Sequence, residues 1–218
     1  MTYKIAQDCQ LANINQLYNM YFNDKLNGYF VEVGAFDGYH MSNTWGLAEA
    51  GWEGLYVEPN HFFVERCKEV HKRNLVAVAE CAISDFDGET EFWLEPNSAS
   101  CTIDRETMER SPWGFKYDPT QVTIVTARKL DTLLVVYKVP PKFDLLVIDV
   151  EGAELKVLAG FSWKLWQPKM IIIEDCYGNV DPGKTFHTDA ITNWFLNTDY
   201  KHVQYDGVNS IYILEEKK

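Results

Sequence analysis

The feature that most constrains the fold is the stretch from Tyr29 to Gly38, YFVEVGAFDG, an apolar run that ends in a glycine-containing turn. The run suits a buried strand, and Gly34 and Gly38 free the backbone that follows it. A parallel strand that leads through such a turn into a helix leaves unpaired N–H groups at its carboxyl end, where open α/β sheets bind ligands. We therefore expect an α/β fold with a ligand beside this turn.

A second strand of the same kind follows. Met41–Ala50 has the pattern of a helix, and Gly54–Glu58 that of a buried strand that again ends in an acid. The small polar residues 42–44 at the start of the helix suit either capping of its free N–H groups or contact with a ligand. Glu58 follows Gly34 by roughly the 20-residue offset at which dinucleotide folds place the acid that binds ribose hydroxyls.

Acids also end two apolar runs in the second half of the chain. Phe143–Val150 carries Asp149 near its end, and Met170–Ile173 is followed by Glu174 and Asp175. Neighbouring parallel strands bring their carboxyl ends to one edge of a sheet, so we expect these carboxylates to converge near the glycine turn. Carboxylates that converge in a crevice repel one another unless a proton or a cation lies between them, and oxygen ligands suit magnesium, calcium or manganese. The alternative for Asp149 is a helix N-cap.

The remaining patterns complete a mixed sheet. Helices are expected at 11–26, 60–71, 130–137, 153–166 and 187–197, and strands at 75–83, 200–205 and 209–214.

Residues 86–127 interrupt the alternation of strands and helices. Asp87-Gly88 is typical of a hairpin turn, with residues 89–94 as the returning antiparallel strand and Val122–Ala127 as a strand that pairs with this hairpin. The segment 95–120 is rich in proline and aromatic residues, which is typical of a long surface insertion. We expect it to form a lid over the substrate.

The composition argues against several classes of partner. The chain has 218 residues with 46% hydrophobic content, enough for one domain over 1–218, in which residues 1–28 form a helical cap. Its formal charge is −12, which argues against nucleic acid and anionic membranes as partners. The five scattered cysteines and the absence of a signal-peptide pattern lead us to expect a cytoplasmic protein, with its oligomeric state left open.

Taken together, the motifs resemble those of the FkbM-type S-adenosylmethionine-dependent methyltransferases. The resemblance rests on EVGAFDG (32–38), SNT (42–44), GWEGLYVEPN (51–60), LDTL (130–133) and IDVEGAELKVLAG (148–160). It implies the class I methyltransferase fold, a Rossmann-like three-layer sandwich whose seven-stranded sheet is mostly parallel with an antiparallel last strand. The glycine turn of this chain departs from the commoner E-x-G-x-G-x-G pattern, because Phe36 occupies the position of the middle glycine. Val147 occupies a position at which family sequences often have lysine.

The resemblance also implies a set of site residues. Asp149 would stand beside the reacting centre, Glu58 would hold the ribose, and Ala82, Ile83 and Ser84 would lie near adenine. The residues carried over as S-adenosylmethionine contacts are Gln7, Asp8, Glu32, Gly34, Ala35, Gly38, Ser42, Asn43, Thr44, Glu58, Pro59, Ala82, Ile83, Ser84 and Asp149. We further expect that replacing Glu32 with Gln weakens cofactor binding and leaves the fold intact.

A weaker resemblance is to metal-dependent O-methyltransferases of sugars and natural products. It implies that Asp149, Glu174 and Asp175 bind Mg²⁺, which would lower the pKa of a substrate hydroxyl, with a carboxylate or His187 taking the proton. The expected substrate is a small hydroxylated molecule, a glycan sugar or a secondary metabolite. The alternatives are a catalytically silent binding module and, with less support, a nucleotide-sugar oxidoreductase or epimerase.

Overall fold

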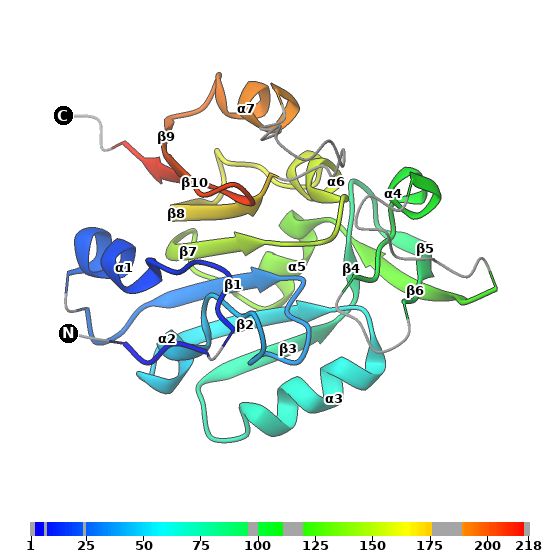
Figure 1. Cartoon of the computed structure of the whole chain (residues 1–218), viewed down its shortest axis with the longest axis horizontal. Helices are drawn as coiled ribbons and strands as arrows, with labels where there is room; N and C mark the ends of the chain where they lie inside the picture. Colours follow the sequence, from blue (N-terminus) through cyan, green and yellow to red (C-terminus); the bar gives the residue numbers. More distant parts are fainter. Residues whose placement is uncertain are drawn as a thin grey trace.

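The computed structural model describes residues 3–6, 8–23, 25–95, 100–110, 120–175 and 189–215. A seven-stranded sheet forms its centre (Figure 1), with the strand order β3-β2-β1-β7-β8-β10-β9. The strands are β1 (Tyr29–Val33), β2 (Glu53–Glu58), β3 (Val76–Glu80), β7 (Lys142–Ile148), β8 (Gln167–Glu174), β9 (Tyr200–Tyr205) and β10 (Asn209–Leu214). Strands β3, β2, β1, β7 and β8 pair in parallel, and β10 is antiparallel to both of its neighbours. The predicted fold is therefore confirmed.

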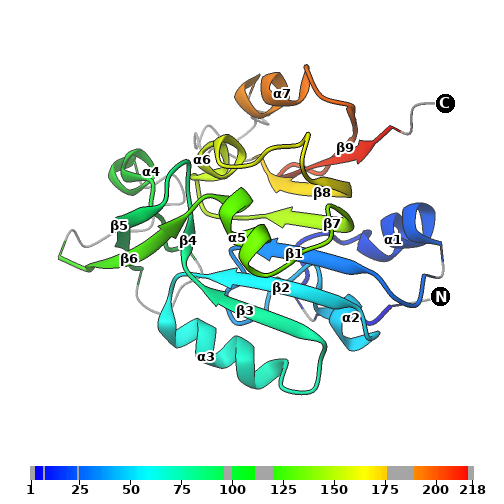
Figure 2. The same cartoon turned by 180° about the vertical axis from the view of Figure 1, so that it is seen from behind.

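Helices cover both faces of this sheet and make three layers. The helices are α1 (Ile14–Phe22), α2 (Trp45–Glu49), α3 (His61–Val70), α4 (Arg105–Arg110), α5 (Leu130–Val136), α6 (Glu154–Ala159) and α7 (Asp189–Phe195). The N-terminal segment, α1 and α2 lie in front of the sheet in Figure 1, whereas α5 lies on the side that faces the viewer in Figure 2. No helix among the described residues is long and apolar enough to span a membrane.

Side chains that alternate along the strands fill these two interfaces. Leu145 and Val147 of β7 belong to the core on the side of α1 and α2, while Leu146 and Ile148 belong to the core on the side of α5, α6 and α7. All four are at most 1% exposed. Burial of each such side chain stabilises the fold by about 1.5–3 kcal/mol, which is why a central parallel strand reads as a continuous apolar run.

A second, smaller sheet lies beyond the carboxyl ends of β1 and β2 (Figure 1) and corrects the predicted hairpin. It consists of β4 (Ala82–Ile83), β5 (Gly88–Trp93) and β6 (Val122–Arg128) in the order β4-β6-β5. The prediction that β5 returns along the preceding strand is wrong, because β6 lies between β4 and β5 and pairs with both. The turn at Asp87 is instead tied to the start of α5, since its carboxylate accepts hydrogen bonds from Lys129 N (3.1 Å) and Thr132 Oγ1 (3.0 Å).

Several element boundaries also differ from the prediction. The expected strand 75–83 divides at Cys81 into β3 and β4, which belong to different sheets. The expected helix 153–166 is only the short α6, which ends before Gly160. Helices α1 and α2 are likewise shorter than predicted. Half of the expected lid 95–120 lies outside the described residues, which include Glu95, 100–110 and Thr120.

Candidate functional site

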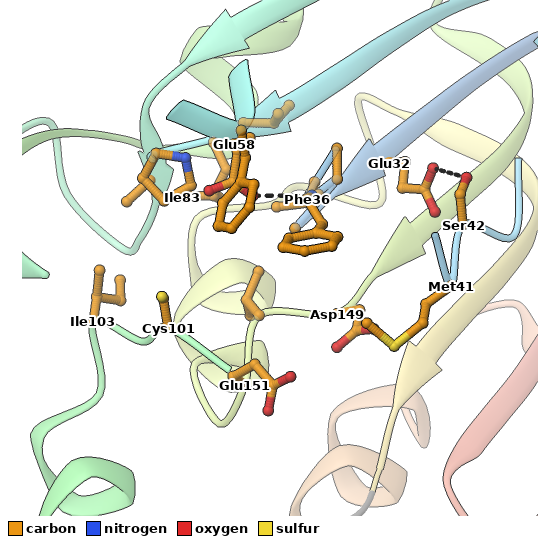
Figure 3. A pocket seen from close by; sticks show the side chains of 18 of the residues that line it. Glu32, Phe36, Met41, Ser42, Glu58, Ile83, Cys101, Ile103, Asp149 and Glu151 are labelled. Atoms are coloured by element: carbon orange, nitrogen blue, oxygen red, sulfur yellow. Dashed lines mark hydrogen bonds between the residues drawn. The ribbon is translucent and has the colours of Figure 1, made fainter. Parts of the chain in front are cut away.

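A pocket opens at the carboxyl ends of β1, β2 and β7 (Figure 3), between the main sheet and the smaller one. It encloses about 830 Å³ of empty space, including the part that is open to solvent. The side chain of Glu58 points into it from the end of β2, and those of Asp149 and Glu151 point into it from the segment after β7. Of the residues predicted from the sequence as cofactor contacts, those that line the pocket are Glu32, Gly34, Ala35, Ser42, Glu58, Pro59, Ala82, Ile83 and Asp149.

The glycine turn is held between β2 and β7. Gly34 N and Ala35 N both donate to the carbonyl oxygen of Val57 at 3.0 Å. Gly34 has φ +87°, and a Cβ atom there would lie 1.6 Å from the carbonyl oxygen of Asp149. Gly34 is therefore required by the close approach of the β7 backbone as well as by its own backbone conformation.

Glu58 stands at the carboxyl end of β2 and is 7% exposed. One carboxylate oxygen accepts a hydrogen bond from Phe36 N (3.0 Å) and the other from Asn60 N (2.8 Å). Burial raises the pKa of Glu58 to about 7, although these two hydrogen bonds oppose the shift. Each oxygen keeps a lone pair that can accept a further hydrogen bond, which suits a pair of neighbouring hydroxyl groups.

Glu32 organises the segment before α2. Its carboxylate accepts hydrogen bonds from Ser42 Oγ (2.8 Å), Asn43 N (3.1 Å) and Thr44 Oγ1 (2.6 Å). Burial raises its pKa to about 7. Ser42 Oγ also accepts from Trp45 N (3.0 Å), the first residue of α2, whereas the side chain of the N-cap residue Thr44 caps no N–H group of the helix. Of residues 42–44, only Ser42 lines the pocket.

Three carboxylates meet at Asp149, which is the one of them that lines the pocket. Oxygen atoms of Asp149, Glu154 and Glu174 lie within 4.8 Å of one another. Gln10 Nε2 donates to Asp149 Oδ2 at 2.5 Å, and burial raises the pKa of Asp149, against the lowering effect of hydrogen bonds with Gln10 and Glu174. Glu154 Oε1 accepts from the N–H groups of Val150 (3.0 Å) and Gly152 (3.3 Å). The structure thus assembles an oxygen-rich site of the kind that hard divalent cations prefer.

With this geometry established, comparison with known proteins decides the family. Residues 32–202 match the model of the methyltransferase FkbM domain. The chain belongs to this family. Its family and fold are those of S-adenosylmethionine-dependent methyltransferases. No curated protein matches it.

Three bacterial proteins are among the solved structures to which this chain is similar. A protein assigned as a caffeoyl-CoA O-methyltransferase from Staphylococcus aureus has 12% identity and a TM-score of 0.49, with 96% of this chain and 86% of that chain covered. A protein assigned as a methyltransferase from Escherichia coli has 9% identity, a TM-score of 0.46 and coverages of 97% and 91%. The third, a SAM-dependent methyltransferase from Agrobacterium tumefaciens, has 8% identity, a TM-score of 0.44 and coverages of 95% and 62%.

Other predicted site residues of this FkbM-family chain lie away from the pocket or outside the described part. Asp175 is fully buried and accepts a hydrogen bond from Ser210 Oγ at 2.8 Å, and it is not one of the three carboxylates that meet. Asp8 is exposed. Ser84 is buried, and its hydroxyl donates a hydrogen bond to the Asp85 carboxylate. Gly38, Asn43 and Thr44 lie beside the pocket without lining it. Gln7 and His187 lie outside the described residues.

The FkbM-family pocket also contains residues outside the set of site residues predicted from the sequence. Phe36, Met41 and Glu151 have positive φ angles of 50°, 58° and 55°, and all three line the pocket. Such backbone strain is concentrated at functional sites. The Phe36 ring packs on that of Phe63 at 4.1 Å between centroids and forms an apolar wall. The further lining residues outside the predicted set of site residues are Gln10, Val33, His40, Val57, Cys81, Phe92, Cys101, Ile103 and Val150. Gln10, Phe92, Cys101 and Ile103 are distant in the sequence from every motif quoted above, so no local pattern indicated them.

Proposed function

We propose that this protein transfers a methyl group from S-adenosylmethionine to a hydroxyl group of a small acceptor, a glycan sugar or a secondary metabolite. The observation that carries the proposal is the charge of the pocket. Glu32, Glu58, Asp149 and Glu151 line it, and no lysine or arginine is among its described lining residues. An acidic, partly apolar pocket suits a cofactor with a sulfonium cation and disfavours one that carries phosphate groups.

The lining residues fit the parts of this cofactor. Glu58 would hold the ribose, because its side chain lines the pocket while backbone N–H groups fix the positions of its two oxygens. Phe36, Phe63 and Ile83 would offer an apolar wall to the adenine ring. Asp149 would lie near the positively charged end of the molecule.

The reaction requires that the acceptor lose a proton. When bound, S-adenosylmethionine supplies an electrophilic methyl group, and the pocket must place the acceptor oxygen in line with it. The carboxylate of Asp149 lines the pocket and could take the proton, and Gln10 Nε2 donates a hydrogen bond to one of its oxygens. His187 remains a second candidate base, outside the described residues.

We also propose that a divalent cation assists the reaction. Asp149, Glu154 and Glu174 would hold it, each through one oxygen, because their oxygen atoms come within 4.8 Å of one another. Asp175, which the sequence placed in this set, is engaged by Ser210 instead. A bound Mg²⁺ or Mn²⁺ would lower the pKa of an acceptor hydroxyl.

The test is a screen of hydroxylated sugars and phenols with S-adenosylmethionine labelled in its methyl group, followed by mass spectrometry and NMR of each labelled product. We expect label on an acceptor oxygen. Label found only on nitrogen or carbon would contradict O-methylation. Tight binding of S-adenosylhomocysteine with no labelled product from any acceptor would instead favour the silent binding module.

A further inference from the structure

The pocket contains one side chain that can carry a positive charge among its described lining residues, His40. Asp37, three residues earlier, holds its ring. The Asp37 side chain is 4% exposed, and its Oδ2 lies 2.7 Å from His40 Nδ1. Asp37 Oδ1 accepts from the backbone N–H groups of Tyr39 (3.1 Å) and His40 (2.9 Å). The carboxylate therefore fixes the ring orientation and makes Nδ1 a donor, as aspartates do in Asp–His pairs.

The carboxylate that orients this ring is ionised. Burial raises the pKa of Asp37, but the hydrogen bonds from His40 and Tyr39 outweigh burial and hold the pKa below its ordinary value. The guanidinium of Arg66, on α3, lies 3.7 Å from Asp37 Oδ2. Asp37 thus has its own cation and its own backbone donors, and its position does not depend on a ligand.

The second ring nitrogen of His40 has no such partner. Among the described residues, Asp37 is the one polar partner of the His40 side chain. The His40 side chain is 47% exposed, whereas that of Asp37 is buried. Since the residue also lines the pocket, Nε2 is the atom left to meet a ligand.

The charges of the pocket indicate which part of the cofactor would contact His40 Nε2. The amino-acid end of S-adenosylmethionine carries an ammonium group and a carboxylate. Asp149 and Glu151 would repel the carboxylate, whereas His40 would attract it. With Asp37 at Nδ1 and the ligand carboxylate at Nε2, each ring nitrogen would have a carboxylate partner.

We propose that His40, oriented by Asp37, binds the carboxylate of the methionine part of S-adenosylmethionine. Asp37 is then a positioning residue that acts through His40. This inference rests on the proposed placement of the cofactor in the pocket. It adds a contact on the glycine turn that lies outside the set derived from sequence motifs.

Two ligands separate this contact from the rest of the site. Calorimetry compares S-adenosylhomocysteine with its decarboxylated analogue, which keeps the adenosine, the thioether and the amine. A charged hydrogen bond contributes about 1.5–3 kcal/mol, so we expect the wild-type protein to bind the analogue about 10- to 100-fold more weakly. Equal affinity of the two ligands would overturn the proposal without touching the cofactor assignment, whereas failure of both to bind would overturn the two together.

Variants then locate the contact. In His40→Asn the shorter amide can still donate to Asp37 while the Nε2 position is lost. We expect this variant to bind S-adenosylhomocysteine about 10- to 100-fold more weakly and the decarboxylated analogue within about twofold of the wild type. Asp37→Asn should show the same pattern with a smaller loss, and His40→Gln, which can place an amide near the Nε2 position, should recover part of the affinity.

A matched control is His61→Asn, because His61 is exposed, pairs with Glu80 and does not line the pocket. It should bind both ligands as the wild type does. If His40→Asn weakens both ligands equally, or neither, the contact is not with the carboxylate. Equal affinity of the two ligands for the wild-type protein would overturn the contact even if a variant does not fold.

Discussion

Glu58 accepts a hydrogen bond from the backbone N–H of Phe36 at 3.0 Å, and this contact joins the carboxyl end of β2 to the glycine turn after β1. The turn is also joined to β7, because Gly34 leaves no space for a side chain against the carbonyl of Asp149. The two acids proposed to meet the cofactor therefore approach one short turn from opposite sides, each at the end of its own strand.

Gly34→Ala should be strongly destabilising. An added Cβ would lie 1.6 Å from the carbonyl oxygen of Asp149, at a φ of +87°. The matched control is Gly51→Ala, where φ is +90° and nothing lies within 4 Å of the added atom. We expect a loss of about 1–2 kcal/mol for the control from backbone conformation alone, and of more than about 3 kcal/mol for Gly34→Ala. Urea unfolding measures both, and equal losses would show that the approach of β7 does not constrain the turn.

Glu32→Gln should lower stability as well as cofactor binding. The sequence led us to expect an intact fold, but the carboxylate accepts three hydrogen bonds, and the amide nitrogen of Gln would face a donor. A buried donor left without a partner costs about 1–3 kcal/mol, which corresponds to a fall in melting temperature of about 2–4 °C per kcal/mol for a domain of this size. Glu53→Gln, at the exposed start of β2, should leave the melting temperature unchanged. An unchanged melting temperature for Glu32→Gln would restore the original expectation.

The stability of the ligand-free protein should fall as the pH rises through about 7. Burial raises the pKa of Glu32 and of Glu58 from the ordinary value of 4.5 to about 7. Between these values the folded protein holds protons that the unfolded chain has lost, so their stabilising effect is complete below pH 4.5 and is lost as the pH rises through about 7. Scanning calorimetry at pH 5.5 and 8 at constant ionic strength should give the lower melting temperature at pH 8. A higher melting temperature at pH 8 would contradict the burial of protonated acids at this site.

Mg²⁺ or Mn²⁺ should raise the melting temperature through the three converging carboxylates. A ligand at a hundred times its Kd stabilises the folded state by about 2.7 kcal/mol. Glu174→Gln should abolish the increase, because Glu174 is one of the three. Asp175→Asn should retain it relative to its own metal-free melting temperature, because Asp175 is bonded to Ser210. An increase that survives in Glu174→Gln, or none in the wild-type protein, would remove the cation from the mechanism.

The central sheet could be predicted from the sequence because its strands are apolar on both faces. Leu145–Ile148 contacts one helical layer with odd residues and the other with even residues, so the run is uninterrupted and easily recognised. The ends of these strands carry acids and glycines, and this local pattern predicted Glu58 and Asp149 as pocket residues.

Contacts between distant segments could not be predicted in this way. The two-residue strand β4 pairs with β6, far along the chain, although a turn sequence immediately follows it. Gln10 reaches Asp149 from the N-terminal segment. Glu154 takes the place of Asp175 among the converging acids, and the Asp175 carboxylate accepts a hydrogen bond from Ser210 near the start of β10. Each of these outcomes depends on tertiary packing, and no sequence period records it.

The most direct test of the central claim is calorimetric titration with S-adenosylhomocysteine of the wild-type protein, Glu58→Gln and Glu80→Gln. Glu80 is the exposed register partner of Glu58 at the end of β3 and does not line the pocket. We predict binding by the wild-type protein and by Glu80→Gln, and binding about 10- to 100-fold weaker by Glu58→Gln. Absence of binding by the wild-type protein, or equal affinity in all three proteins, would contradict the placement of the cofactor in this pocket.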